Sequence, residues 1–348
     1  MNTSTMPPNK RLPILALTVG DPAGIGPEIA VRAATDARVS ARARVLLVGD
    51  EDIVRRAVKL CNLPVGLHVV DNPELAGGQA NDIDVLAIKV ASADEVVPGK
   101  VSALAGHSAI VAVETATRLA LDGRVDAIVT APINKEAIWA AGSKHIGHTE
   151  MLGNLTGARE PITMFVVRGA KIFFTTRHMS LRQAIEQINR DRVLAAIGSA
   201  LIALRVFGHS EPRLAVAALN PHGGEGGTFG REEIDHIAPA VEAAKAKGER
   251  VSGPVPADSV FHQALEGRYD GVLAQFHDQG HIASKTVDFN GTVSVTAGLP
   301  ILRTSVDHGT AFDIAGTGQA SHETMVAATL TAASLTRYLD NIRSVYGK

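Results

Sequence analysis

The sequence has little of what marks a secreted, a membrane-spanning or a nucleic-acid-binding protein. Its 348 residues include one cysteine, Cys61, which excludes an internal disulfide and suits a reducing cytoplasm. No apolar run approaches the roughly 20 residues of a membrane span, and the N-terminal MNTSTMPPNKRLP lacks the apolar segment of a signal peptide. A formal net charge of −2 gives no electrostatic attraction to nucleic acid or to an anionic membrane. We therefore expect a cytoplasmic protein with neither partner.

Aromatic residues are also scarce, at 4%, whereas hydrophobic residues make up 45% of the chain. Short β-branched runs alternate with longer alanine-rich stretches of helical period. The predicted strands are 13–19, 44–49, 125–131, 171–176, 213–219, 269–276 and 293–298. The predicted helices are 26–37, 107–123, 181–188, 191–208, 231–248 and 321–339. This alternation predicts an α/β fold whose largely parallel strands are covered by helices on both faces. The length indicates two domains or lobes.

Polar motifs follow the predicted strands at the points where they end. In open α/β sheets, ligands bind beyond the carboxyl ends of the strands, so these motifs indicate an active site. They are GDPAGIGPE (20–28), APINK (131–135), RH (177–178), NPHGGEGG (220–227) and HDQGH (277–281).

Three of these motifs contain a histidine close to a strand end: His178, His222 and His277. Neutral imidazoles from three separate elements, with a fourth position open, make a good divalent metal site, most readily for zinc. Each histidine taken alone is better explained as a polar loop residue, but the three together favour a metal site. We interpret residues 278–280, which follow His277, as a turn in which Gly280 permits close approach.

The remaining motifs are individually ambiguous. GDPAGIGPE is neither the dinucleotide-binding fingerprint nor a P-loop, and it suits a tight strand-to-helix turn as well as an anion site. Lys135, Lys285 and Arg303 are either solvated surface cations or anchors for a carboxylate or phosphate. Thr149, in GHTEML, is by default a helix N-cap, and DHGTAFDIAG (307–316) reads as a capped turn before a helix.

Taken together, the motifs resemble those of the 4-hydroxythreonine-4-phosphate dehydrogenase family of vitamin B6 synthesis and its close paralogues. The resemblance extends from about residue 13 to beyond residue 330, in family order. Its motifs are TVGDPAGIGPE, TAPINK, GHTE, LNPHGGEGG, PAD, HDQGH with a following lysine, and GLPILRTSVDHGTAFDIAG. It implies a two-lobed fold like that of isocitrate and isopropylmalate dehydrogenases, with largely parallel sheets and an active-site cleft between the lobes. That fold explains an NAD enzyme without the usual glycine fingerprint.

The same resemblance implies how the lobes and ligands are arranged. Lobe one, residues 1–137 plus 279–348, is expected to carry the NAD-binding loop. Lobe two, residues 138–278, is expected to carry the metal ligands and the interface of a homodimer that shares the metal site. The expected cofactors are NAD or NADP and a divalent metal, with zinc favoured and magnesium, cobalt, manganese or nickel as alternatives.

The site residues that the resemblance implies fall into four groups. His178, His222 and His277 match the metal ligands. The matches to substrate-binding positions are His148, Thr149, Lys285, Ser294 and Arg303, with the serine standing where the family has asparagine. The loop expected to bind NAD contains His308, Gly309, Thr310, Ala311 and Asp313. Asp258 and Lys285 are both candidates for the catalytic proton carrier.

The implied reaction is oxidation of a secondary alcohol β to a carboxylate, followed by loss of carbon dioxide. His281 makes HDQGHI resemble the paralogues that act on 4-phospho-D-threonate or 4-phospho-D-erythronate, since enzymes for 4-hydroxy-L-threonine 4-phosphate commonly have leucine there. The retained Arg303, Thr304 and Asp307 favour such a substrate over an aromatic cis-dihydrodiol carboxylate, which a more distant paralogue oxidises. A metal-dependent hydrolase and a non-catalytic phosphometabolite-binding protein are the alternatives, and the three histidines argue against the second.

Overall fold

The computed structural model describes residues 11–77 and 82–347, and the chain divides into two compact units. Unit 1 consists of Met1–Met151 and Ile301–Thr336, and unit 2 consists of Leu152–Pro300 and Arg337–Lys348. These bounds differ from the expected ones, because residues 138–151 join unit 1, whereas 279–300 and 337–348 join unit 2. The reason is pairing: the strand at 293–297 pairs with the strand at 162–167. The C-terminal helix also packs within unit 2.

Unit 1 is built on six strands, each parallel to its neighbour. Their order is β3 (Gly66–Val69), β4 (Asp82–Ala87), β2 (Arg44–Gly49), β1 (Ile14–Thr18), β5 (Ala127–Thr130) and β12 (Arg303–Ser305). The central strands β1 and β5 are buried along their whole length, which explains why their sequences are continuous apolar runs rather than alternating ones.

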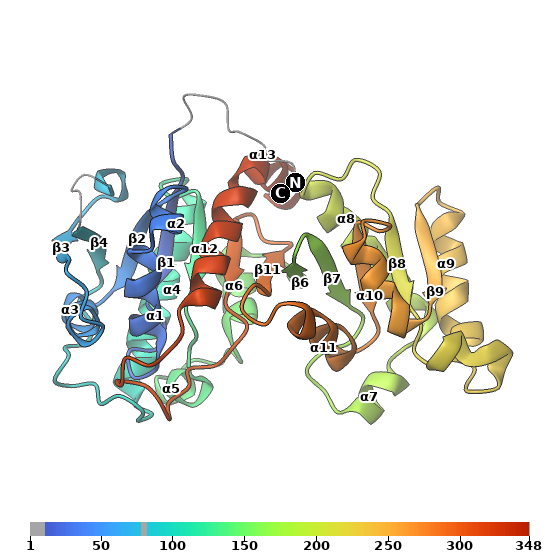
Figure 1. Cartoon of the computed structure of the whole chain (residues 1–348), viewed down its shortest axis with the longest axis horizontal. Helices are drawn as coiled ribbons and strands as arrows, with labels where there is room; N and C mark the ends of the chain where they lie inside the picture. The colour runs from blue at the N-terminus through green and yellow to red at the C-terminus, as the bar shows by residue number, and fades with distance from the viewer. Residues whose placement is uncertain (1–10, 78–81, 348) are drawn as a thin grey trace. The chain divides into compact units, whose positions relative to one another are not determined.

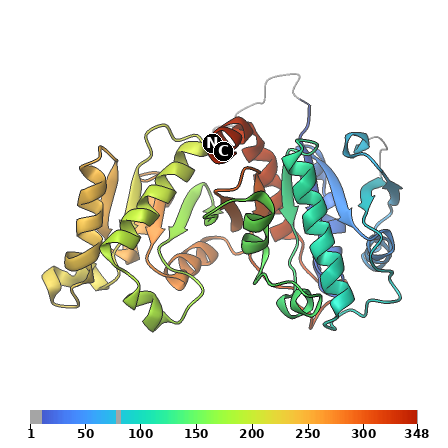
Figure 2. The same ribbon diagram turned by 180° about the vertical axis from the view of Figure 1, so that it is seen from behind.

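Helices cover both faces of this part of the sheet (Figures 1 and 2). One face carries α1 (Gly26–Ala34), α2 (Ala37–Ser40), α3 (Glu51–Leu60) and α12 (Glu323–Leu335). The other carries α4 (Ala103–Leu121), against which α5 (Lys135–Ala140) packs. Helix α6 (His148–Thr156) begins in unit 1 and ends in unit 2.

Unit 2 contains the other six strands, and four adjacent ones run parallel. The order is β11 (Val293–Ala297), β6 (Ile162–Val167), β7 (Ala170–Phe174), β10 (Gly271–Ala274), β8 (Leu214–Ala217) and β9 (Val251–Val255). Strand β6 is antiparallel to both β11 and β7. It joins β7 through Arg168 and Gly169, both of which have positive φ, as a tight hairpin requires.

Helices again lie on both faces of the unit 2 strands (Figures 1 and 2). α8 (Arg190–Val206) and α9 (Ala238–Lys245) pack together on one face, and α10 (Ala257–Leu265) and α11 (His277–Val287) cover the other. The remaining helices of the unit are α7 (Leu181–Glu186) and α13 (Leu339–Tyr346). Short 3₁₀ or π turns occur at Pro73–Leu75, Pro221–Gly227, Glu233–Ile237 and Thr336–Tyr338.

The predicted α/β class with largely parallel strands is confirmed, and every predicted strand is present, with each end within two residues of its predicted place. The predicted helix 26–37 is interrupted, because the Asp36 carboxylate caps a separate helix, α2. The interpretation of residues 278–280 as a turn was wrong, because they form the first turns of α11. The expectation of close approach at Gly280 is confirmed. A Cβ there would lie 2.5 Å from the Phe174 ring, so only glycine lets α11 pack this closely on β7.

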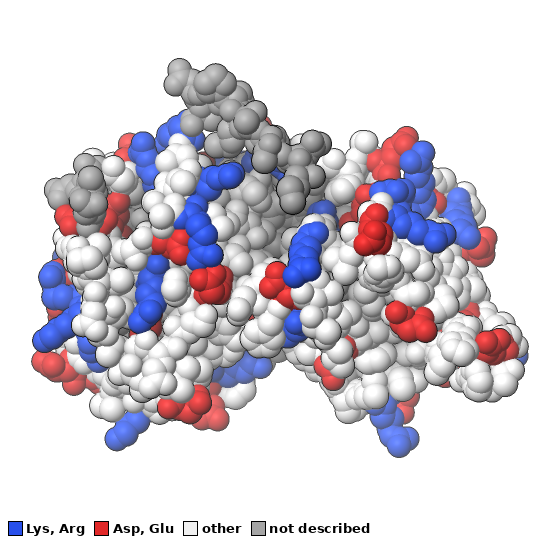
Figure 3. All heavy atoms as spheres, viewed as in Figure 1, with Lys and Arg blue, Asp and Glu red and all other residues white. Residues whose placement is uncertain are grey.

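Charged side chains of both signs are interspersed over the face shown in Figure 3, in keeping with the nearly balanced composition. Within residues 11–77 and 82–347, no helix is both long and apolar enough to cross a membrane.

Candidate active site

Four candidate site residues of unit 2 follow four neighbouring parallel strands. His178 comes after β7, His277 after β10, His222 after β8 and Asp258 after β9. Strands β7, β10, β8 and β9 are adjacent in that order and run in the same direction. Their carboxyl ends therefore lie along one edge of the sheet, which is where ligands bind in open α/β folds.

His178 and His277 are neighbours at this edge. Their ring centroids are 5.6 Å apart, and the rings are tilted by 49°. His277 begins α11, its side chain is 37% exposed, and its Nδ1 lies 2.6 Å from the Asp278 carboxylate. A carboxylate that holds one ring nitrogen orients the other, as is usual around metal-binding histidines.

His222 lies in a loop whose backbone is left-handed from His222 to Gly226. Its side chain is 65% exposed, and its Nδ1 is 3.2 Å from Glu225 Oε1. Three glycines of this stretch adopt positive φ without the strain that other residues incur there. Among the described residues, no three side chains of His, Cys, Asp or Glu gather closely enough to hold a metal ion. The structure thus brings together two of the three expected ligands and places the third at the same sheet edge.

One face of α11 carries His277, His281 and Lys285, which are spaced four residues apart. The ring of His281 stacks on that of His277, with centroids 3.7 Å apart and planes 9° from parallel. His281 Nδ1 donates to the His277 carbonyl oxygen at 2.9 Å. The rings of Phe165 and Phe174 also contact the His281 ring, with centroids 4.4 and 5.0 Å away. His281 thus helps to hold His277 in place. Sequence reasoning did not predict this role for His281.

The other candidates of unit 2 are Ser294, Asp258 and Lys285. Ser294 is the second residue of β11, opposite Phe165 of β6, and is buried. Asp258 lies in the first turn of α10. Lys285 Nζ lies 5.4 Å from the centre of the Phe289 ring, so its charge is held near the last turn of α11.

The candidates of unit 1 form a contrasting, buried cluster. Arg303 is 4% exposed, and its Nε and Nη2 donate to Thr130 Oγ1 at 3.1 and 2.6 Å. Burial lowers the pKa of Arg303 to about 9, so the guanidinium still carries its charge at neutral pH. Burial, helped by the nearby charge of Arg303, holds the pKa of His148 well below its usual value, which leaves that imidazole neutral. His148 Nε2 is buried without a hydrogen-bond partner, and Thr149 follows it in the first turn of α6.

Asp21 is a buried residue that sequence reasoning missed. Its carboxylate accepts from the backbone N–H groups of Ala23, at 2.8 Å, and Asn134. Its Oδ2 has no hydrogen-bond partner, and burial raises the pKa of Asp21 to about 6. The only signal in the sequence is an acidic residue inside an otherwise apolar, glycine-rich turn.

The loop expected to bind NAD, which contains His308 to Asp313, is fastened to α1. Ile25 N donates to the Thr310 carbonyl at 3.0 Å, and Glu28 Oε1 accepts from Gly316 N at 2.6 Å. Arg32 Nη2 donates to the Gly318 carbonyl at 2.8 Å. His308 Nε2 is 2.9 Å from Thr324 Oγ1, and Ala311 takes a left-handed φ of 41°.

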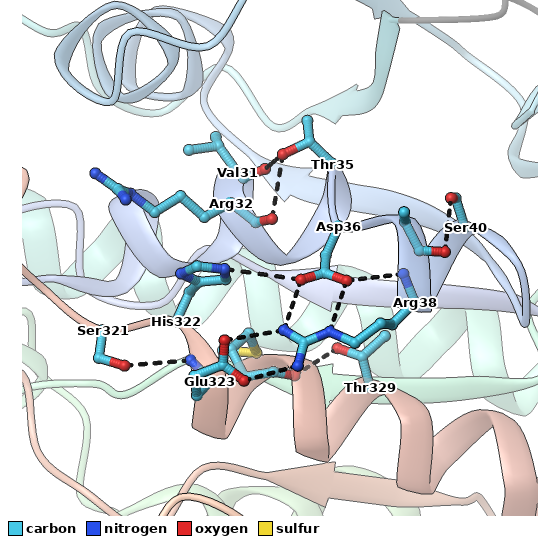
Figure 4. A network of polar contacts seen from close by, with 12 residues as sticks. Val31, Arg32, Thr35, Asp36, Arg38, Ser40, Ser321, His322, Glu323 and Thr329 are labelled. Atoms are coloured by element: carbon cyan, nitrogen blue, oxygen red, sulfur yellow. Dashed lines mark hydrogen bonds and ion pairs between the residues drawn. The ribbon is translucent and has the colours of Figure 1, made fainter.

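The end of this loop is held by a second set of contacts, at the start of α12 (Figure 4). The Arg38 guanidinium binds the carboxylates of Asp36 and Glu323, with contacts of 2.7 to 2.9 Å. His322 Nε2 lies 3.8 Å from Asp36. These contacts tie the loop to α1, and the start of α12 to α2.

Comparisons with known proteins agree with this architecture. The family model described as pyridoxal phosphate biosynthetic protein PdxA matches residues 41–332. A relative from Cutibacterium acnes, named putative D-threonate 4-phosphate dehydrogenase, is 54% identical over 97% of each chain. The crystal structure of 4-hydroxythreonine-4-phosphate dehydrogenase from Klebsiella pneumoniae is 44% identical, with a TM-score of 0.87, and the match covers 94% of this chain and 99% of that one.

A terephthalate 1,2-cis-dihydrodiol dehydrogenase from Burkholderia xenovorans is also similar, but less so. It is 31% identical, with a TM-score of 0.61, over 93% of this chain and 98% of its own. The family resemblance seen in the motifs is thus confirmed across nearly the whole sequence. The chain belongs to the PdxA family.

Proposed function

We propose that this protein is an NAD- and divalent-metal-dependent dehydrogenase that oxidises and decarboxylates a 4-phosphorylated four-carbon hydroxy acid. The observation that carries the proposal is the placement of His178, His277 and His222 after three adjacent parallel strands. The name of the Cutibacterium acnes relative favours 4-phospho-D-threonate as the substrate. The alternatives within the class are 4-phospho-D-erythronate and 4-hydroxy-L-threonine 4-phosphate.

The donor set suits a divalent metal. Imidazole is a good ligand for zinc, cobalt, nickel and manganese, with zinc the best match to three histidines and magnesium a weaker one. Two of the rings are 5.6 Å apart, and the third is exposed on a loop at the same sheet edge. We infer that a second copy of the chain completes the site in a homodimer. When bound, the metal supplies Lewis-acid stabilisation of the negative charge that develops on the substrate oxygen.

The buried cluster of unit 1 suits an anionic group of the substrate. Arg303 offers a charged fork of N–H donors, and the neutral His148 has a ring nitrogen without a partner. The Thr149 hydroxyl adds a further hydrogen bond. Lys285 and Ser294 of unit 2 supply a cation and a hydroxyl for the rest of the substrate. Ser294 is shorter than the asparagine that the resemblance leads us to expect, so it reaches less far.

The reaction needs one proton carrier. Oxidation of the alcohol sends a hydride to NAD and leaves the hydroxyl proton with a base, either Asp258 or Lys285. The β-keto acid then loses carbon dioxide, and the same proton returns to the carbon that carried the carboxylate. The products are a ketone phosphate, carbon dioxide and NADH. NAD is proposed to lie along His308 to Asp313, where the fastening to α1 keeps the backbone in one conformation.

A screen of NAD reduction tests the proposal. The wild-type protein, supplied with zinc, cobalt or magnesium, is offered 4-phospho-D-threonate, 4-phospho-D-erythronate, 4-hydroxy-L-threonine 4-phosphate and an aromatic cis-dihydrodiol carboxylate. We expect NADH and carbon dioxide in equal amounts with 4-phospho-D-threonate. Substrate breakdown without NAD reduction would instead identify a hydrolase, and exclusive use of the dihydrodiol would overturn the substrate class.

His222→Ala tests the metal ligands in the same assay. Loss of one of three ligands is expected to lower both the bound metal and kcat, the latter on the order of 100-fold or more. His262→Ala, on the exposed side of α10, is the matched control and is expected to behave like the wild type. Full metal content and normal turnover in His222→Ala would refute the assignment.

A further inference from the structure

A cavity of about 420 Å³ lies in unit 2. It is bounded by the start of β6, the end of β7 and the first half of α8. Small side chains of α8 leave the space open, namely Ala195, Ala196 and Ser199. The opposite wall includes Thr175, Arg177 and His178, from the segment that follows β7. Its size is typical of sites for small metabolites.

Arg177 brings a charge without an ion-pair partner to this cavity, whose lining also includes Glu160 and Arg192. Its guanidinium donates to the hydroxyl of Thr163, which also lines the space. No carboxylate within residues 11–77 and 82–347 forms an ion pair with Arg177, and the residue is partly buried. A guanidinium has five N–H donors, and one hydroxyl acceptor leaves most of them unused. A guanidinium held partly away from water with most donors unused lowers the stability of the fold unless an anion accepts its hydrogen bonds.

Thr175 provides an independent sign of a ligand. The residue is 7% exposed, it lines the same cavity, and its Oγ1 is buried without a hydrogen-bond partner. The backbone N–H of Thr175 does have a partner, because it donates to the Ala274 carbonyl at 2.8 Å. Buried hydroxyls are normally paired, so an unpaired one beside an uncompensated guanidinium indicates a missing acceptor.

We propose that Arg177 and Thr175 form an oxyanion site that takes the carboxylate of the hydroxy-acid substrate. This inference rests on the proposed function. The guanidinium fork matches a planar carboxylate with two parallel hydrogen bonds. His178, the expected metal ligand, lines the same cavity, and in the proposed reaction the carboxylate is the anionic group nearer to the reacting carbons.

The proposal also explains a substrate preference. A cation beside the carboxylate repels an ammonium group on the adjacent carbon but accepts a hydroxyl there. Arg177 therefore favours a hydroxy acid, such as 4-phospho-D-threonate, over the amino acid 4-hydroxy-L-threonine 4-phosphate.

Arg177→Met tests the site with two substrates, 4-phospho-D-threonate and its carboxamide. NAD reduction reports hydride transfer for both, since the amide can be oxidised without losing carbon dioxide. We expect kcat/KM for the acid to fall on the order of 100-fold in Arg177→Met, whereas the already low value for the carboxamide changes by less than about threefold. Arg182→Met, an exposed arginine of α7 outside the cavity, is the control and should leave both values unchanged. Equal losses on both substrates would overturn the proposal.

A binding measurement separates this inference from the proposed function. Malonate and inorganic phosphate are used as probes in thermal unfolding of the full-length protein. We expect malonate to raise the Tm of the wild type but not of Arg177→Met, and the variant alone to be at least as stable, because it loses an uncompensated charge. If the wild type never reduces NAD but keeps an Arg177-dependent malonate shift, the site stands and the proposed function fails. An Arg177-dependent shift with phosphate only, or a variant with lowered Tm and altered oligomeric state, would overturn the carboxylate assignment.

Discussion

The polar groups of unit 1 and of unit 2 are prepared for ligands in opposite ways. In unit 1, Arg303 is almost fully buried and held by Thr130, and His148 is neutral with its Nε2 atom buried. In unit 2, the side chains of His222 and His277 are 65% and 37% exposed. Arg303 is therefore already removed from water, whereas His222 stays mostly exposed and His277 partly exposed.

The two regions therefore differ in how much they lower the stability of the protein without ligand. A preformed, dry cluster binds an anion without further reorganisation, but it lowers the stability of the empty protein. Partly exposed histidines cost little in the empty protein, and a bound metal would add to the contacts that already hold His277. We expect substitutions in unit 1 to affect both binding and stability, and substitutions of the histidines to affect mainly the metal and turnover.

The largest effect is expected for Arg303→Met. Loss of a buried charged donor to a phosphate or carboxylate costs about 2–5 kcal/mol, so kcat/KM should fall by about 30-fold to a few thousand-fold, with KM carrying much of the change. Bound metal, measured by elemental analysis, should stay at the wild-type level because the histidines lie in the other unit. Arg118→Met, an exposed arginine of α4, serves as the control. Loss of metal in Arg303→Met would break the contrast between the units.

A smaller effect, on stability alone, is expected for Asp21→Asn. Because burial raises the pKa of Asp21 from 3.8 to about 6, the folded protein binds a proton that the unfolded chain has released between these values. The carboxylate therefore lowers stability as pH rises through this window, and its cost is fully present above about pH 6. Asparagine removes that cost, which at 1.36 kcal/mol per pKa unit is roughly 3 kcal/mol.

Urea unfolding from pH 4 to pH 8 measures this effect. The two proteins should have similar stability near pH 4, where the carboxyl is protonated in the folded state. The free energy of unfolding of the variant should rise relative to that of the wild type between pH 4 and 6. Above pH 6 the difference should stay constant. A variant that is equally destabilised at every pH would show that the carboxylate contributes hydrogen bonds rather than a burial cost.

The sequence predicted the strands around the site, and with them the positions of the histidines at one sheet edge. It could not predict α11, because HDQGHIASK is polar and contains a glycine, and the helix depends on Gly280 fitting against Phe174. Strand β9 was missed because VSGPV contains glycine and proline, and β12 because it has only three residues. The states of Asp21 and Arg177 were also out of reach, because burial and the absence of a partner are properties of the packed chain rather than of a motif.

The smallest effect is expected for His281, which links the two kinds of environment within unit 2. Its ring contacts Phe165 and Phe174 and is stacked on the ring of His277. His281→Leu keeps an apolar contact with the phenylalanines but loses the stack and the hydrogen bond to the His277 carbonyl. Mutation of a residue that supports a metal ligand typically lowers metal affinity or activity by about 10- to 100-fold. We therefore expect metal affinity to weaken by about tenfold, with a smaller loss of kcat at saturating metal.

His281→Phe is the matched variant, because it retains a flat ring but cannot donate to the carbonyl oxygen. If stacking positions His277, the phenylalanine variant should hold metal better than the leucine variant, and if the hydrogen bond dominates, the two should be equally impaired. Metal titration of the apoprotein, followed by elemental analysis, distinguishes these results. Wild-type affinity in both variants would show that His281 only fills space between α11 and the sheet, and that the exposed histidines of unit 2 are ordered by the metal without help from the buried side of the helix.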